Sequence, residues 1–230
     1  MNALKATMNR AKQTVEEKLG DAKKTELDPE LQRALQRIDD VKIFTNKTLS
    51  AVAAFLQPDP TQRMLEGFMQ EGANKAEVVG QDMSQLATKI GSDDPYGKAM
   101  VHGAEAFNKL GQAERERLKA AQAAYIAPVK KFLNEDVKAL DSARKDLENK
   151  RLDMDSLKGK IGKGNEAVDE QFKKSEETYE AQVNNVRDLV KDVDAKIPDL
   201  QNALKELVKA ELDYLSQAQQ IWKDYEKQLK

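Results

Sequence analysis

The chain has 230 residues, of which 34% are charged, 40% hydrophobic and only 5% aromatic, and its formal net charge is −2. This composition favours long helices over sheets. The chain has no cysteine, which excludes disulfide and thiolate chemistry, and no run of 18 apolar residues that could span a membrane. The first residues lack the continuous apolar stretch of a secretory signal, so we expect a cytoplasmic protein.

Positive charge gathers at two places in an otherwise acidic chain. Residues 1–24 carry a net charge of +3 and residues 150–164 another +3, which leaves −8 for the remainder. Clusters of this kind suit an anionic partner surface, and each also fits a chance grouping on a solvated helix face.

The first segment, residues 1–19, has helical periodicity. Its apolar side chains recur every three or four residues and share one helix face: Met1, Leu4, Met8, Ala11, Val15 and Leu19. The basic residues Lys5, Arg10 and Lys12 lie off that face. A basic amphipathic helix is suited to a membrane interface, with its apolar side inserted. The alternative is a helix packed on the domain core, but the break at Gly20 favours a segment that swings free.

Asp28 and Pro29 are typical of a helix start, and a helix is predicted from there to about Gln57, before Pro58. Residues 58–95 form an insert that interrupts the long-helix pattern with prolines and glycines, and a short helix is predicted over 76–90. The insert contains an apolar cluster that is either a second membrane-inserting segment or a cap on the core: Met64, Leu65, Phe68 and Met69.

Two long helices follow, over about 96–157 and 166–229, and each contains a proline that should bend it, Pro128 and Pro198. About 60 helical residues at roughly 1.5 Å each form a rod of about 90 Å. A compact globule of this length has a diameter of only about 45 Å. The sequence therefore predicts an all-α, elongated, kinked antiparallel coiled coil whose thin core needs a second copy of the chain.

The Gly-rich turn over 157–165 should lie at the tip of this helical hairpin. Seven basic residues surround it and are candidates for binding anionic headgroups: Lys150, Arg151, Lys158, Lys160, Lys163, Lys173 and Lys174. A Gly/Lys turn is also common as a plain soluble loop.

Catalytic patterns are absent from the sequence. The single histidine, His102, has no carboxylate cluster or cysteine nearby, and no phosphate-binding glycine loop has the required spacing. We expect no enzyme activity, no cofactor, no metal and no nucleic-acid partner.

Six stretches resemble the N-BAR domain of endophilins, and most closely that of the B-type endophilins: EEKLGDAKKTELD (16–28), FLQPDPTQR (55–63), DDPYGKAM (93–100), AYIAPVKKF (124–132), ENKRLDMDSLK (148–158) and ELDYLSQAQQI (211–221). The resemblance implies a crescent-shaped homodimer of three kinked helices per subunit, with an inserting amphipathic helix and a concave-face insert. It also implies proline-rich or GTPase partners, bound through modules such as an SH3 domain that lie outside these residues.

The predicted organisation is an N-terminal amphipathic helix with its connector over 1–27, followed by a BAR domain over 28–230. We expect a peripheral membrane protein that senses and generates curvature on anionic phospholipid bilayers. The alternatives are a cytosolic coiled-coil adaptor that binds proteins through its acidic surface and a straight, spectrin-like spacer.

Overall fold

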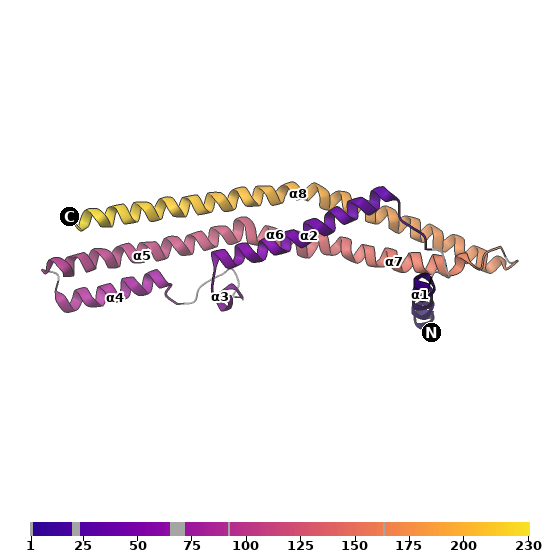
Figure 1. Ribbon diagram of the computed structural model, residues 1–230, viewed down its shortest axis with the longest axis horizontal. Coiled ribbons are helices and arrows are strands. Elements are labelled where there is room, and N and C mark those ends of the chain that lie inside the picture. Colours follow the sequence, from indigo (N-terminus) through magenta and orange to yellow (C-terminus); the bar gives the residue numbers. More distant parts are fainter. Residues whose placement is uncertain (1, 20–23, 65–71, 92, 163) are drawn as a thin grey trace. The chain divides into compact units, whose positions relative to one another are not determined.

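The computed structural model describes residues 2–19, 24–64, 72–91, 93–162 and 164–230 (Figure 1). All regular structure in these ranges is helical. The elements are α1 (Asn2–Leu19), α2 (Pro29–Leu56), α3 (Pro60–Met64), α4 (Lys75–Ile90), α5 (Pro95–Ala121), α6 (Ala127–Lys131), α7 (Lys138–Lys158) and α8 (Glu166–Gln228), with π-helical segments η2 (Gln122–Ile126) and η3 (Phe132–Val137). None of the helices in the described ranges is long and apolar enough to cross a bilayer.

The predicted helices are confirmed to within about two residues at their ends. The predicted 96–157 helix is continuous from Pro95 to Lys158, but it contains the two π-helical segments. They lie on either side of α6, which carries Pro128. A proline inside a helix lacks one backbone donor and its ring clashes with the preceding turn. Wider π turns on each side relieve that clash without ending the helix.

The chain divides into two compact units. The first comprises Met1–Phe44 and Lys131–Ile197, and the second comprises Thr45–Lys130 and Pro198–Lys230. In the first unit, α2 packs with α7 and the first half of α8. Among its most deeply buried side chains are Ile38, Leu140 and Val186, one from each helix. Each such side chain contributes about 1.5–3 kcal/mol through its burial.

Ion pairs at the edges of this first core fix α2 against both neighbours. Arg144 on α7 binds Asp39 on α2 with a shortest N–O distance of 2.5 Å. On the other side, Arg187 of α8 binds Asp28 at the start of α2 at 2.8 Å. These pairs are partly exposed, so they specify the register of the helices more than they stabilise it.

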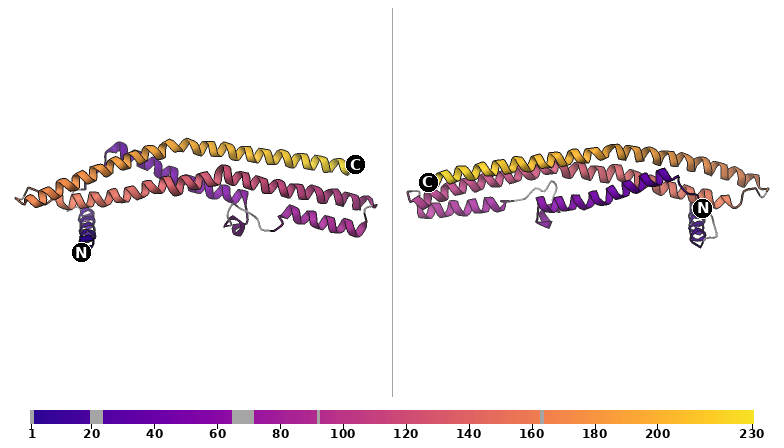
Figure 2. Two further views of the ribbon diagram at one scale, coloured as in Figure 1. Left: turned by 180° about the vertical axis from the view of Figure 1, so that it is seen from behind. Right: turned by 45° about the horizontal axis from the view of Figure 1, so that its top comes forward.

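In the second unit, α4 lies alongside α5 in both views of Figure 2. Asn74 caps α4 and donates from its side-chain amide to the Gly111 carbonyl of α5 at 2.8 Å. A Cβ at position 111 would lie 2.7 Å from the Asn74 side-chain oxygen, so glycine allows this close approach. At the other end of α4, the Gly97 backbone of α5 passes against Gly91.

Candidate functional site

The first helix, α1, packs against α7 rather than standing free (Figure 1). The Arg10 guanidinium donates two hydrogen bonds to the Asp153 carboxylate on α7, of 2.8 and 2.5 Å. Gln13 lies buried one turn further along and donates to Glu17 at 3.1 Å. The expectation that this segment swings free is therefore wrong in this structure, because polar side chains that lie outside its apolar stripe hold it in place.

Arg151 of α7 is the centre of this contact. Its side chain is only 4% exposed, and it binds Glu17 of α1 through two hydrogen bonds of 2.7 and 2.9 Å. It also binds Asp155 at 2.7 Å and Glu148 at 2.7 and 3.0 Å on its own helix. A buried cation of this kind needs several acceptors to offset its lost hydration. Arg151 thus joins one carboxylate from α1 to two from α7.

The pKa values of these groups follow from the same contacts. Hydrogen bonds from Arg151 hold the pKa of Glu17 below its ordinary value, and they lower the pKa of Glu148 as well. Burial opposes the charged form of Arg151, but its hydrogen bonds to Glu148 and Glu17 outweigh that effect and raise its pKa. Glu17, Glu148 and Arg151 are therefore ionised at neutral pH.

The connector after α1 is tied to the same end of α7. The backbone N–H and the hydroxyl of Thr25 both donate to the Asp155 carboxylate, at 2.9 and 2.5 Å. Lys158 donates to the Thr25 hydroxyl at 3.1 Å. The Asp155 side chain is fully buried, so these donors and Arg151 together replace its hydration.

The apolar side of α1 stays exposed to solvent. Met8 is 66% exposed and Val15 is 55% exposed, and Ala11 between them is exposed as well. At about 100° per residue, the docking side chains Arg10 and Glu17 lie roughly 160–180° around the helix from Met8. Helix α1 therefore contacts the protein with one side and presents its apolar stripe on the other.

The remaining predicted site residues fall into three groups. Lys12, Lys158, Lys160, Lys173 and Lys174 are exposed. Lys150 binds Asp146 at 2.9 Å and Gln182 at 3.1 Å. For the other predicted positions, either the residue or its side chain is not among those that the structure describes: Met1, Leu4, Lys5, Met64, Leu65, Phe68, Met69 and Lys163.

A second apolar surface lies on α8 within the second unit. Leu204, Val208, Leu212 and Leu215 recur every three or four residues and are 43–61% exposed. Such spacing places them on one helix face. Within the described part of this unit, Leu204 and Leu215 both remain exposed to solvent. A contiguous apolar face of this kind is typical of a protein–protein interface.

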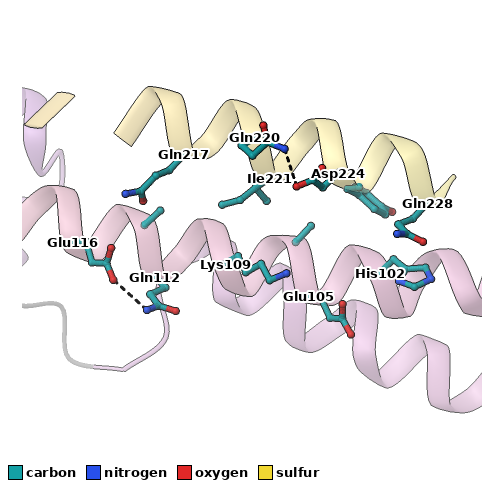
Figure 3. Close-up of a pocket in the computed structure, with 13 residues that line it drawn as sticks. His102, Glu105, Lys109, Gln112, Glu116, Gln217, Gln220, Ile221, Asp224 and Gln228 are labelled. Atoms are coloured by element: carbon teal, nitrogen blue, oxygen red, sulfur yellow. Dashed lines mark hydrogen bonds between the residues drawn. The ribbon is translucent and has the colours of Figure 1, made fainter. Parts of the chain in front are cut away.

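A cavity of about 430 Å³ lies between α5 and the end of α8 in the second unit (Figure 3). Most of the residues that line it are polar, and Gln112 and Gln220 donate along their own helices to Glu116 and Asp224. His102 lies at one end of it. Within the described residues, no group of three or more histidine, cysteine or acidic side chains could hold a metal ion. This cavity shows no nucleophile–base pair.

Comparison with known proteins assigns the family. Residues 4–230 match the BAR domain. Endophilin-B1 of Homo sapiens is 31% identical over 235 residues, which cover 96% of this chain and 64% of that protein. Endophilin-B2 of Homo sapiens is 37% identical over 166 residues, 69% of this chain and 42% of that protein. The chain thus spans less than two thirds of these relatives.

A BAR protein from Galdieria sulphuraria is a similar solved structure, with a TM-score of 0.46 and 17% identity, covering 85% of this chain and 95% of that one. The resemblance to B-type endophilins that the six sequence stretches indicate is confirmed. BAR domains are dimerising, membrane-binding scaffolds and not enzymes. Because the BAR domain match extends over nearly all of its residues, this chain belongs to the BAR domain family.

Proposed function

We propose that this chain senses and generates curvature on anionic bilayers, as a curved homodimer that inserts the apolar side of α1 between lipid headgroups. The observation that carries the proposal is the exposed stripe of Met8, Ala11 and Val15 on the side of α1 that faces away from α7. Soluble proteins rarely leave such side chains unburied along a helix face without a partner for them.

The energies favour reversible binding. Burying Met8 and Val15 in the acyl region contributes about 1.5–3 kcal/mol each, and an exposed lysine such as Lys12 adds about 1 kcal/mol near an anionic surface. One helix of this kind binds weakly after it loses its freedom of movement. Two copies held in one dimer bind much more tightly, because the second insertion occurs at a high effective concentration.

The α8 stripe supports the homodimer. Four apolar side chains on one face, from Leu204 to Leu215, are suited to burial against an apolar surface of a second copy. Nearby, the Arg117 guanidinium binds Glu211 at 2.8 Å and lies 5.0 Å from the Tyr214 ring centroid, which orders this part of α8.

For the headgroup contacts, the proposal uses the exposed basic side chains Lys12, Lys158, Lys160, Lys173 and Lys174. Arg10, Lys150 and Arg151, also proposed from sequence, are engaged in ion pairs within the protein. Lys163 and Lys5 complete the basic set, and the segment containing Met64, Leu65, Phe68 and Met69 stays a proposed second inserting element. We place the protein on the cytoplasmic side of its membrane, with any proline-rich or GTPase partners bound through modules outside these residues.

Vesicle binding tests the proposal. The protein should co-sediment with phosphatidylserine-containing liposomes, draw them into tubules visible by electron microscopy, and bind neutral liposomes much less. Met8→Ser with Val15→Ser should reduce binding about tenfold or more, because two apolar insertions are lost. A protein whose binding ignores phosphatidylserine and both substitutions is instead an adaptor for protein partners.

A further inference from the structure

We propose that α1 inserts into the bilayer while it stays docked on α7, so that the inserted helix is a rigid part of the protein rather than a tethered one. This inference rests on the proposed function and goes beyond it, because insertion alone does not require docking. The juxtaposition that carries it is a helix with two opposed contact sides: a polar side bound to α7 and an apolar side left in solvent.

The docking side uses no residue that insertion needs. Arg10, Gln13 and Glu17 face α7, and their contacts are hydrogen bonds and ion pairs. Met8, Ala11 and Val15, which insertion would bury, make no part of this contact and are exposed. A bilayer can therefore take up the apolar side without competing for any atom that holds α1 on α7.

Undocking would also expose groups that the contact keeps satisfied. Glu17 has a side chain only 11% exposed, and two guanidinium nitrogens of Arg151 bind it. Arg10 and Asp153 bind through two parallel hydrogen bonds, the strongest geometry for such a pair. The membrane interface has less water than bulk solution, and Coulomb attraction between these charges increases as the dielectric constant falls. The Coulomb attraction within each of these ion pairs is therefore at least as strong at the membrane as in water.

The mechanical consequence distinguishes this arrangement from a flexible anchor. A helix that is free on its connector inserts at any angle to the rest of the protein. A helix clamped at two points one to two turns apart, Arg10 and Glu17, keeps a fixed crossing angle on α7. Its insertion then sets the orientation of α7 on the bilayer. A membrane curvature that favours insertion of α1 therefore also favours contact between α7 and the bilayer.

Distance measurements between α1 and α7 test the inference. The chain has no cysteine, so Asn9→Cys with Ser142→Cys gives two exposed spin-label sites, one on each helix. Pulsed electron spin resonance should give one narrow distance distribution in solution, and the same distribution on phosphatidylserine vesicles. A separate label at Met8→Cys reports insertion through its contact with lipid-soluble quenchers.

Charge reversal provides the matched variants. Asp153→Lys places a cation opposite Arg10 and should raise the undocked population about tenfold or more, which broadens the distribution. Arg10→Glu added to Asp153→Lys should narrow it again in solution. The control is Asp188→Lys, the same charge change at an exposed α8 residue that pairs with Lys191 on its own helix; it should leave the distribution unchanged.

Two results would contradict this account, and each would overturn a different part of it. A distribution that broadens or lengthens on vesicles while the Met8 label contacts lipid overturns the docked insertion and leaves the proposed function standing. A Met8 label that stays in water on vesicles overturns the proposed function itself. Asp153→Lys should also form fewer tubules than Asp188→Lys at equal bound protein, and equal tubule formation would count against the rigid coupling.

Discussion

Replacing Arg151 with methionine removes the cation that Glu17, Glu148 and Asp155 share. Asp155 is fully buried and Glu17 nearly so, whereas the Glu148 side chain is 52% exposed and can be hydrated. Breaking a buried pair typically costs about 3–5 kcal/mol because it leaves an uncompensated charge. Thr25 still donates twice to Asp155, so we expect the lower end of that range, about 3 kcal/mol at pH 7.

The loss should depend on pH in a defined direction. Arg151 lowers the pKa of Glu17 and Glu148 in the folded state, so its stabilisation is fully present above their unfolded pKa of about 4.5 and is lost as the pH falls through their folded values. In the variant this stabilisation is missing at every pH. The difference in unfolding free energy between the two proteins should therefore stay constant from pH 7 to about pH 4.5 and shrink as the pH falls further.

Urea unfolding followed by circular dichroism at fixed protomer concentration measures this difference. The expected loss corresponds to a fall in Tm of about 6–12 °C for a chain of this length. Arg187→Met is the matched control, because Arg187 forms an exposed pair with Asp28 and should cost less than about 1 kcal/mol. A cost for Arg151→Met equal to that of the control, or one that grows toward acid pH, would refute the reasoning.

Three further results are expected. Deleting residues 1–19 should weaken tubule formation on phosphatidylserine vesicles severalfold and leave the dimer intact by light scattering; a monomer would show that the segment is structural. Leu212→Asp, which places a charge on the exposed α8 stripe, should raise the dimer Kd about ten- to hundredfold in analytical ultracentrifugation, whereas an unchanged Kd would place the interface elsewhere. Gly97→Ala should destabilise the protein by about 1–3 kcal/mol despite the better helix propensity of alanine, because its Cβ would lie 2.0 Å from the Gly91 carbonyl oxygen; urea unfolding without a loss would contradict that contact.

The positions of the helices could be predicted from the sequence because each helix depends on local signals. Apolar periodicity, the Asp28–Pro29 start and the Pro58 stop each depend only on nearby residues, and together they predict α2 almost to its ends. The π turns on either side of Pro128 were not predicted. The sequence shows that a proline must disturb the helix there, but surrounding packing selects among a bend, a break and a wider turn.

The docking of α1 could not be read from the sequence, because it depends on partners more than 130 residues away along the chain. The sequence marks Arg10 only as a basic residue of an amphipathic helix and Asp153 not at all, and nothing local indicates that the two side chains form a pair. Arg151 looked like one of seven basic side chains near a turn, and the structure shows that it is buried among carboxylates. Counting charges along a sequence does not distinguish a solvated cation from one already neutralised by its neighbours.

This distinction bears on how an acidic protein binds an anionic surface. Residues 150–180 contain seven basic side chains but also eight acidic ones, six of them after residue 165 in α8. Charges within a Debye length, about 8 Å at physiological salt, act on a membrane as one local sum. Simple adhesion at the hairpin turn would therefore be weak, and in the proposed function the insertion of α1 would provide most of the binding energy. A protein that depends on insertion would gain from a helix held at a fixed angle, which is the role we propose for the ion pairs of Arg10 and Arg151.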